Sequence, residues 1–336
     1  MKPVIFGLSG LVLTDNERAF FADVEPAGYI IFKRNVLDRA QLRALTDDLR
    51  ALHGRDDLAI LIDQEGGRVA RMGPPEWPKF PAGAAFDALY QTAPMTAIQA
   101  ARLNGEALGL MLAEVGITVD CLPLLDVRTP ATHEAIGDRA LGSDPMQVAA
   151  LGRATIDGLR AGGVVGVVKH MPGQGRATVD SHYDLPRVTS NAKELEVDFG
   201  AFAKLAAAPM GMTGHIVFEA FDADQPATLS PIVIEQIIRG KIGFTGLLMS
   251  DDLDMKALSG SVATRARDCV VAGCDIALNC WGRFDEMVAI AELLPEITDA
   301  ARTRLDAAMA TISPPETVEK FAECIAKRDA LLAYAA

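Results

Sequence analysis

Cysteine is scarce in this sequence, and its few copies are scattered. There are five cysteines, none of them in a C-x-x-C pair, which excludes the usual zinc-ribbon and thioredoxin-type sites. An odd, sparse set of this kind is typical of reduced thiols buried in a core and indicates a reducing compartment. We therefore expect buried, reduced thiols at Cys121, Cys269, Cys274, Cys280 and Cys324.

Long hydrophobic runs are also missing. No stretch approaches the roughly 18 apolar residues that a membrane-spanning helix needs, so we expect no membrane partner. The first residues carry one lysine and a short apolar run, as a weak signal peptide would. Glycines interrupt that run, and the T-D-N-E stretch at 14–17 is typical of a helix start after a strand. These features predict a cytoplasmic protein.

Positive charge is in deficit. The chain has 32 Lys+Arg against 45 Asp+Glu, a net charge of −13. Such an excess of negative charge argues against nucleic acid or an anionic membrane surface as a partner. It does not exclude a small anionic substrate, because a few clustered arginines and lysines can dominate one pocket.

Half of the 336 residues are hydrophobic, which is enough for a large core. Short apolar runs alternate with longer helical patterns along the chain. The predicted strands cover residues 4–8, 28–32, 58–62, 117–125, 166–169, 211–217, 246–250 and 276–279, and the predicted helices include 41–52, 96–114, 144–160, 192–207, 230–238 and 263–272. Glycines at 116, 162 and 273 are suitable helix stops.

Eight strands alternating with helices predict a parallel (β/α)8, TIM-like barrel. We expect one domain over residues 1–336, with a C-terminal helical extension. A doubly wound open sheet is the alternative, since periodicity does not reveal closure. Reactive groups favour the barrel, because Asp63, Asp126, Lys169, His215 and Asp251 each stand at or just after the end of a predicted strand. Barrel active sites are built from such strand ends.

The most informative stretch is K-H-M-P-G-Q-G at 169–175, followed by D-S-H at 180–182. Lys169 and His170 lie at the end of a predicted strand, and the proline and glycines after them permit a sharp turn in the loop. In extended backbone Asp180 and His182 share a face, so the carboxylate can orient the imidazole as a general acid or base. A solvated loop with incidental polar residues is the alternative, and the preceding motif disfavours it.

A second cluster of acids, S-D-D-L-D at 250–254, follows a buried strand. Adjacent Asp251 and Asp252 should point to different sides, so that one faces the barrel mouth while the other caps a helix or pairs with a base. Three acids within four residues are compatible with a divalent metal, but the histidines have no metal-ligand spacing, and we expect no metal.

Two further stretches suit a polyol ligand. Asp63 and Arg71 lie in D-Q-E-G-G-R-V-A-R at 63–71, and Arg139 lies in G-D-R-A-L-G at 137–142. Carboxylates accept hydrogen bonds from sugar hydroxyls, and arginine donates them from a rigid fork. Structural Asp–Arg bridges are the alternative. Lys169 at a strand end also permits a different chemistry, a Schiff-base lyase.

Together these motifs resemble glycoside hydrolase family 3, and within it the bacterial β-N-acetylhexosaminidases of peptidoglycan recycling. The resemblance extends from residue 63 to beyond Asp252. The family loop commonly reads K-H-F-P-G-H-G, whereas this chain has Met171 and Gln174. Gly214 also replaces a more usual alanine.

The resemblance implies a role for individual residues. Asp251 resembles the catalytic nucleophile, His182 the general acid/base, and Asp180 its orienting partner. Residues that resemble those holding the non-reducing GlcNAc are Asp63, Arg71, Arg139, Lys169 and His170. No cofactor is implied.

The implied activity is a retaining exo-β-N-acetylglucosaminidase (EC 3.2.1.52). Its expected substrate is GlcNAc linked to 1,6-anhydro-N-acetylmuramic acid, with or without the stem peptide. By resemblance, its product feeds signals for β-lactamase induction, and hence antibiotic resistance, in some bacteria. The alternatives are a β-glucosidase or phosphorylase of the same family, a Schiff-base lyase using Lys169, and a sugar-binding protein without catalysis.

Overall fold

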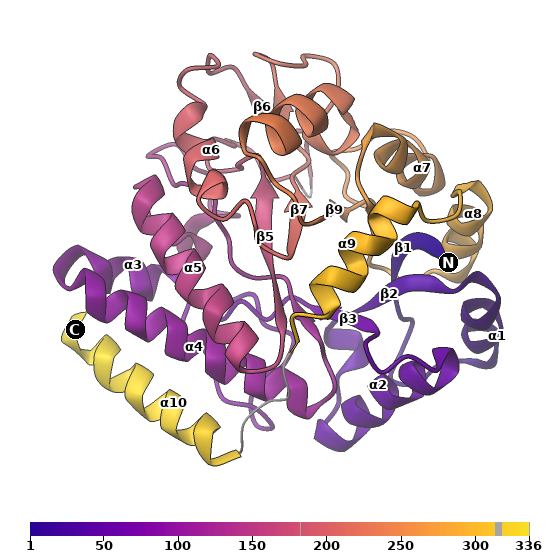
Figure 1. The fold of residues 1–336 in the computed structure, drawn as a ribbon, viewed down its shortest axis with the longest axis horizontal. Coiled ribbons are helices and arrows are strands. Elements are labelled where there is room, and N and C mark those ends of the chain that lie inside the picture. The colour runs from indigo at the N-terminus through magenta and orange to yellow at the C-terminus, as the bar shows by residue number, and fades with distance from the viewer. Residues whose placement is uncertain (182, 313–317, 336) are drawn as a thin grey trace.

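A computed structural model describes the chain except for residues 182, 313–317 and 336. The centre of the described part is a parallel barrel. Its strands are β1 (Lys2–Gly7), β2 (Pro26–Ile31), β3 (Ala59–Ile62), β4 (Val119–Asp120), β5 (Val165–Met171), β7 (Met210–Thr213), β9 (Leu247–Asp252) and β10 (Ile276–Asn279). Because β1 pairs in parallel with both β2 and β10, the sheet closes on itself (Figure 1). The predicted single-domain (β/α)8 barrel is confirmed, and the doubly wound sheet is wrong.

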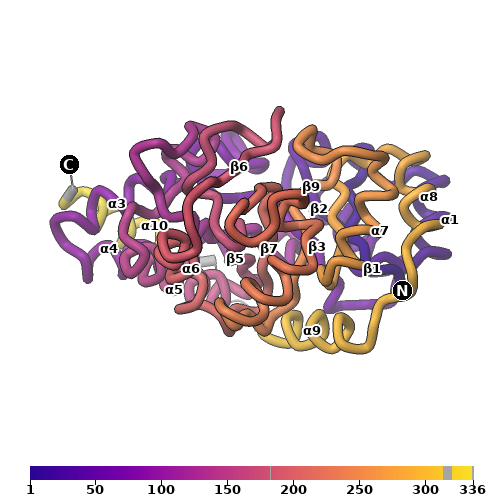
Figure 2. Tube along the Cα trace, turned by 90° about the horizontal axis from the view of Figure 1, so that it is seen from above, coloured from indigo at the N-terminus to yellow at the C-terminus, as the bar shows by residue number. Residues whose placement is uncertain are grey.

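Helices surround this barrel. They are α1 (Asp15–Val24), α2 (Arg39–His53), α3 (Gly83–Thr92), α4 (Pro94–Glu114), α5 (Pro145–Ala161), α6 (Glu196–Ala203), α7 (Val262–Ala272), α8 (Phe284–Leu293), α9 (Asp299–Met309) and α10 (Val318–Leu332). Figure 2 shows α3, α4 and α10 at one end of the molecule and α1 and α8 at the other. Helix α10 packs against α4, and its Arg328 donates a hydrogen bond to Asn104 of α4 at 3.1 Å.

The strands are apolar on both faces, as parallel strands covered by helices must be. In β1, Ile5 belongs to the cluster inside the barrel, whereas Val4 and Phe6 pack outward against the helices. The same alternation places Ile30 of β2 and Leu61 of β3 inside. Side chains therefore fill the barrel interior, and polar groups are confined to its ends.

The first helix begins where the sequence predicts. Thr14 accepts a hydrogen bond from the Glu17 backbone N–H at 3.2 Å, and the Glu17 carboxylate accepts one from the Thr14 backbone N–H at 2.9 Å. This reciprocal pair is a capping box, which satisfies backbone donors that a helix start leaves open.

Four predicted elements differ in the structure. The helix predicted at 192–207 is shorter and forms only α6, Glu196–Ala203. The strand predicted at 117–125 is regular only over β4, because Pro123 has no N–H to donate to a ladder. The strand predicted at 211–217 splits into β7 and β8 (Val217–Phe218), and β8 pairs separately with β6 (Arg187–Val188). The helix predicted at 230–238 is a π-helix, Val233–Lys241.

Helices α4 and α5 touch through glycines. A Cβ on Gly105 would stand 2.5 Å from the Thr155 carbonyl oxygen, and one on Gly162 would stand 2.6 Å from that of Glu106. Gly109 and Gly158 have similarly close neighbours across the same contact. We call these four glycines the α4–α5 seam. The two backbones meet directly along it, and even a methyl group does not fit.

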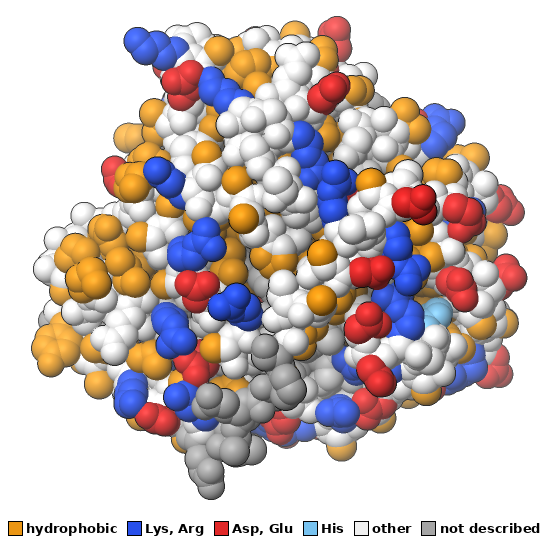
Figure 3. Space-filling view, viewed as in Figure 1, with side chains coloured by type: hydrophobic (Ala, Val, Ile, Leu, Met, Phe, Trp, Pro, Cys, Tyr) orange, Lys and Arg blue, Asp and Glu red, His pale blue; other side chains and the backbone are white. Residues whose placement is uncertain are grey.

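All five cysteines are buried and free, as predicted. On the face shown in Figure 3, basic and acidic side chains are interspersed. Among the described residues, we find no helix long and apolar enough to cross a membrane.

Candidate active site

The predicted site residues meet in one pocket at the carboxyl ends of the barrel strands. Its volume is about 250 Å³. The predicted residues on its wall are Asp63, Arg71, Arg139, Lys169, His170, Asp180 and Asp251. They come from the ends of β3, β5 and β9 and from the loops after β3, β4 and β5, the positions from which barrel enzymes build their active sites.

One wall of the pocket is a chain of ion pairs. Arg71 donates to Asp63 at 2.9 Å, and the Lys169 ammonium lies 3.1 Å from the other Asp63 oxygen. Lys169 also lies 2.7 Å from Glu65, and Arg139 binds both oxygens of Glu65 at 2.8 Å each. Three cations and two carboxylates thus leave a net charge of +1 on this wall.

These contacts fix the charges of the wall. Burial alone would raise the pKa of Glu65, but Lys169 and Arg139 outweigh it and lower that pKa to about 2. Asp63 is likewise buried, and Lys169 and Arg71 hold its pKa well below the usual range. Burial alone would lower the pKa of Lys169, but Glu65 and Asp63 keep it above the usual value. Asp63, Glu65 and Lys169 are therefore ionised at neutral pH.

The charge on Lys169 bears on the Schiff-base alternative. A lysine must lose its proton before its nitrogen attacks a carbonyl. The Lys169 side chain is 3% exposed and is held by two carboxylates. Lys169 is therefore suited to donating hydrogen bonds, and the geometry disfavours a lyase.

A buried carboxylate supports His170. The Oδ2 atom of Asp126 lies 2.7 Å from His170 Nδ1, and its Oδ1 accepts from the backbone N–H of Gln174 at 2.6 Å. Asp126 is fully buried at the end of the irregular strand after β4. A carboxylate on Nδ1 fixes the proton there and turns Nε2 away from it, free to meet a ligand.

Asp251 stands on the pocket wall at the end of β9. Burial opposes its ionisation, but His170, His215, the Asp252 backbone N–H and Lys169 together hold the pKa of Asp251 below its usual value. The N–H of Asp252 donates to Asp251 Oδ1 at 2.8 Å. An ionised, oriented carboxylate of this kind can act as a nucleophile.

Asp252 points elsewhere, as predicted for adjacent residues. Its Oδ1 accepts from the backbone N–H groups of Asp254 and Cys280, each at 3.2 Å. Burial and the neighbouring Asp251 raise the pKa of Asp252 to about 6, against the effect of the two N–H groups. The two carboxyl groups therefore differ in charge behaviour, and only Asp251 lies on the pocket wall.

His215 lies behind this strand end and is fully buried. Its Nε2 lies 2.8 Å from the Asp252 carbonyl oxygen, to which only a protonated nitrogen can donate, and its Nδ1 lies 2.8 Å from the Thr228 hydroxyl. Burial lowers the pKa of His215. His215 thus braces the backbone that carries Asp251.

The loop after β5 carries the predicted Asp–His pair. Asp180 lines the pocket, and its carbonyl accepts from the backbone N–H groups of Tyr183 and Asp184, both at 3.0 Å. The segment therefore turns at Asp180, whereas the sequence predicts extended backbone there. His182 lies outside the described residues. Asp180 makes interactions of its own.

Sequence reasoning missed four residues that shape this pocket. They are Glu65, Asp126, Gln174 and His215. Asp126 and His215 carried one signal, their place at strand ends, and Glu65 stands two residues after Asp63 on the same stretch. Nothing in the spacing indicates that Asp126 holds His170, because the two residues are 44 positions apart. Among the described residues, no group of three His, Cys, Asp or Glu is arranged to hold a metal.

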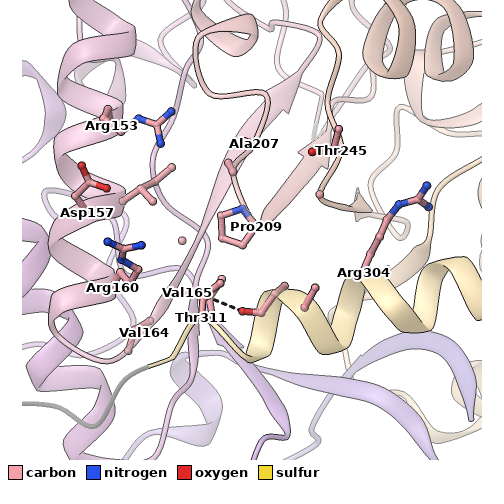
Figure 4. A pocket seen from close by; sticks show the side chains of 16 residues that line it. Arg153, Asp157, Arg160, Val164, Val165, Ala207, Pro209, Thr245, Arg304 and Thr311 are labelled. Carbon is pink, nitrogen blue, oxygen red and sulfur yellow. Dashed lines mark hydrogen bonds between the residues drawn. The ribbon is translucent and has the colours of Figure 1, made fainter.

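A second cavity, of about 320 Å³, lies at the opposite end of the barrel (Figure 4). It opens between α5 and α9, where Arg153, Arg160 and Arg304 surround the amino ends of β5, β7 and β9. Of the predicted site residues that the structure describes, none lines it. The candidate site is therefore the pocket at the carboxyl ends.

The chain matches the model of the family described as "Glycosyl hydrolase family 3 N terminal domain" over residues 9–313. It is 36% identical over 310 residues to a β-hexosaminidase of Alkalilimnicola ehrlichii, covering 91% of this chain and 88% of that one. It is also 36% identical over 312 residues to a β-hexosaminidase of Chromobacterium violaceum, covering 90% and 85%.

Solved structures give the same result. NagZ from Neisseria gonorrhoeae, in complex with N-trifluoroacetyl-D-glucosamine, superimposes with a TM-score of 0.87 at 30% identity, covering 100% of this chain and 98% of that chain. A family 3 β-N-acetylglucosaminidase from Paenibacillus gives a TM-score of 0.76 at 30% identity, covering 99% and 61%. The chain belongs to glycosyl hydrolase family 3 and is a glycoside hydrolase of the β-hexosaminidase class.

Proposed function

We propose that this hydrolase is a retaining exo-β-N-acetylglucosaminidase that releases one non-reducing terminal GlcNAc at a time. The observation that carries the proposal is a pocket in which an ionised Asp251 shares the wall with a chain of hydrogen-bonding charged groups. That pocket is small and has a buried, charged wall, which suits the end of a sugar chain better than its middle.

The wall supplies complementary partners for hydroxyl groups. Asp63 accepts hydrogen bonds, whereas Arg71, Arg139 and Lys169 donate them. Each of these side chains is already fixed by a neighbour in the ion-pair chain, so binding a sugar costs little side-chain ordering. His170 adds an imidazole whose orientation Asp126 fixes.

The chemistry is a double displacement. Asp251 attacks the anomeric carbon while His182 protonates the departing oxygen, which gives a covalent glycosyl-enzyme. Water, deprotonated by His182, then releases GlcNAc with its β configuration retained. Asp180 orients His182 in this scheme. A histidine adds no negative charge beside the nucleophile, and its ordinary pKa already lies near working pH.

The natural substrate in this proposal is a muropeptide fragment, GlcNAc linked to 1,6-anhydro-N-acetylmuramic acid with or without peptide. The enzyme hydrolyses it in the cytoplasm. Support comes from the sequence motifs and from the likeness to NagZ. A β-glucosidase and a phosphorylase remain alternatives within the family.

The deciding experiment compares release of p-nitrophenol from the β-GlcNAc glycoside and the β-glucoside, with and without inorganic phosphate. We expect phosphate-independent turnover of the GlcNAc compound alone, lost in Asp251→Ala. A requirement for phosphate would identify a phosphorylase, and preference for the glucoside a β-glucosidase. No release of p-nitrophenol from either glycoside would refute the hydrolase mechanism.

The role of His182 has its own test. In His182→Ala we expect a large loss of kcat/KM on phenyl β-GlcNAc, whose leaving group needs protonation, and a much smaller loss on activated aryl glycosides. Asp180→Ala should change both substrates in the same direction, more mildly. Equal losses on both substrates would mean that His182 is not the acid.

A further inference from the structure

Gln174 is an unusual wall residue because one of its polar atoms has no partner. Its side chain is 5% exposed and lines the same pocket as Asp180 and Asp251. The Nε2 atom donates to the Ser181 hydroxyl at 3.2 Å. The Oε1 atom is buried without a hydrogen-bond partner in the described part of the chain. Burying an unpaired carbonyl oxygen is unfavourable, so something else must keep Gln174 in place.

The contacts of Gln174 link the barrel to the loop. Its backbone N–H is held by Asp126, the buried carboxylate that also holds His170. Its side-chain amide in turn holds Ser181, the neighbour of Asp180. One short path of hydrogen bonds therefore runs from Asp126, at the carboxyl end of the barrel, to the segment that carries Asp180.

Gly214 makes room for this arrangement. A Cβ on Gly214 would stand 3.3 Å from Gln174 Oε1 and 3.3 Å from the His170 Cβ, closer than such atoms ordinarily pack. The backbone of Gly214 cannot withdraw, because its N–H donates to Met171 O at 2.9 Å and its carbonyl accepts from Thr228 at 3.1 Å. Its φ is not left-handed, so space is the reason for a glycine here.

We infer that Gln174 is a positioning residue, which sets the Asp180–Ser181 segment against the pocket through Ser181, and that Gly214 is its spatial partner. The two departures from the family pattern, Gln174 and Gly214, therefore belong together, because the glycine makes room for the glutamine. The inference rests on the proposed function, since positioning this segment matters only if Asp180 serves the acid/base step.

The first test measures how strongly activity depends on the leaving group. In Gln174→Leu and Ser181→Ala, we expect the ratio of kcat/KM on p-nitrophenyl to that on phenyl β-GlcNAc to rise about tenfold, because general-acid catalysis is weakened while nucleophilic attack is not. Gln225→Leu, at an exposed glutamine, is the control and should leave the ratio unchanged. Equal losses on both substrates would overturn the inference, because a general structural defect acts on both.

The second test is a double-mutant cycle. Gly214→Ala should lower kcat/KM on the phenyl glycoside by about tenfold in the wild type and much less in Gln174→Ala, where the crowded side chain is gone. Equal costs in the two backgrounds would contradict the pairing. Gly200→Ala is the matched control, since a Cβ there meets only Pro145 Cβ at 3.8 Å.

Hydrogen exchange of the peptide covering residues 176–188 makes the inference independent of turnover. We expect faster exchange there in Gln174→Leu and Ser181→Ala, with no change in the thermal midpoint. Unchanged exchange would overturn the inference even if the enzyme is active. Accelerated exchange in a chain that hydrolyses no β-GlcNAc glycoside would support the positioning contact and refute only the proposed function.

Discussion

Removing the charge of Glu65 tests the ion-pair wall most directly. In Glu65→Gln the amide cannot accept from Arg139 and Lys169 as the carboxylate does, and the net charge of the wall rises to +2. The pKa of Glu65 falls from 4.5 to about 2 on folding, which corresponds to about 3 kcal/mol. We therefore expect Glu65→Gln to lower the free energy of unfolding by about 3 kcal/mol at pH 7.

The sign of the pH dependence follows from the same shift. A carboxyl group whose pKa is lowered on folding stabilises the protein fully above pH 4.5, and this contribution is lost as the pH falls towards 2. The difference between wild type and Glu65→Gln should shrink over that window. Urea unfolding at a series of pH values between 7 and 3 measures it.

The matched control is Glu196→Gln, which removes an exposed ion pair with Lys241. Exposed pairs contribute little, so its unfolding midpoint should stay at the wild-type value. We also expect the KM of Glu65→Gln for the GlcNAc glycoside to rise about tenfold, or 1.4 kcal/mol, because Arg139 loses one of its two bonds to its anchor and the remaining bond is no longer charge-assisted. A stability loss below about 1 kcal/mol, or one that is the same at every pH, would refute the reasoning.

Two further predictions concern stability. Asp252 has a pKa of about 6 against an ordinary 3.8, so its ionisation destabilises the fold as the pH rises from 4 to 6. In Asp252→Asn the free energy of unfolding should therefore rise by up to about 3 kcal/mol at pH 7 and should not change at pH 4. Thermal unfolding at both pH values checks this, and an equal gain at both would contradict it. Gly105→Ala should destabilise by about 1–3 kcal/mol despite the better helix propensity of alanine, because its Cβ would collide with the Thr155 carbonyl. Gly200→Ala in α6 should show no such loss, and a stable Gly105→Ala protein would argue against the close contact.

The barrel and the reactive side chains at the ends of its strands could be predicted because both follow from local patterns. Continuous apolar runs identify buried parallel strands, and parallel strands place their carboxyl ends at one rim. The prediction that Asp63, Lys169 and Asp251 meet needs nothing more than that rule, and the structure bears out their meeting.

What could not be predicted depends on contacts between distant elements. The sequence identifies Asp126 only as an acid after a strand. Asp126 binds His170 and Gln174 because the ends of two neighbouring strands come together. The spacing of Asp180 and His182 also predicts extended backbone around Asp180. The backbone turns there instead, since the Asp180 carbonyl accepts from two N–H groups further along the chain.

The α4–α5 seam has a consequence for how the protein responds to compression. Pressure unfolds a protein in proportion to the internal voids that unfolding removes. Along the seam the carbonyls of Thr155 and Glu106 approach bare glycine backbone, and no methyl group fits between the two backbones. Hydrostatic pressure should therefore loosen this helix pair last, and its amides should be the slowest to exchange as pressure rises.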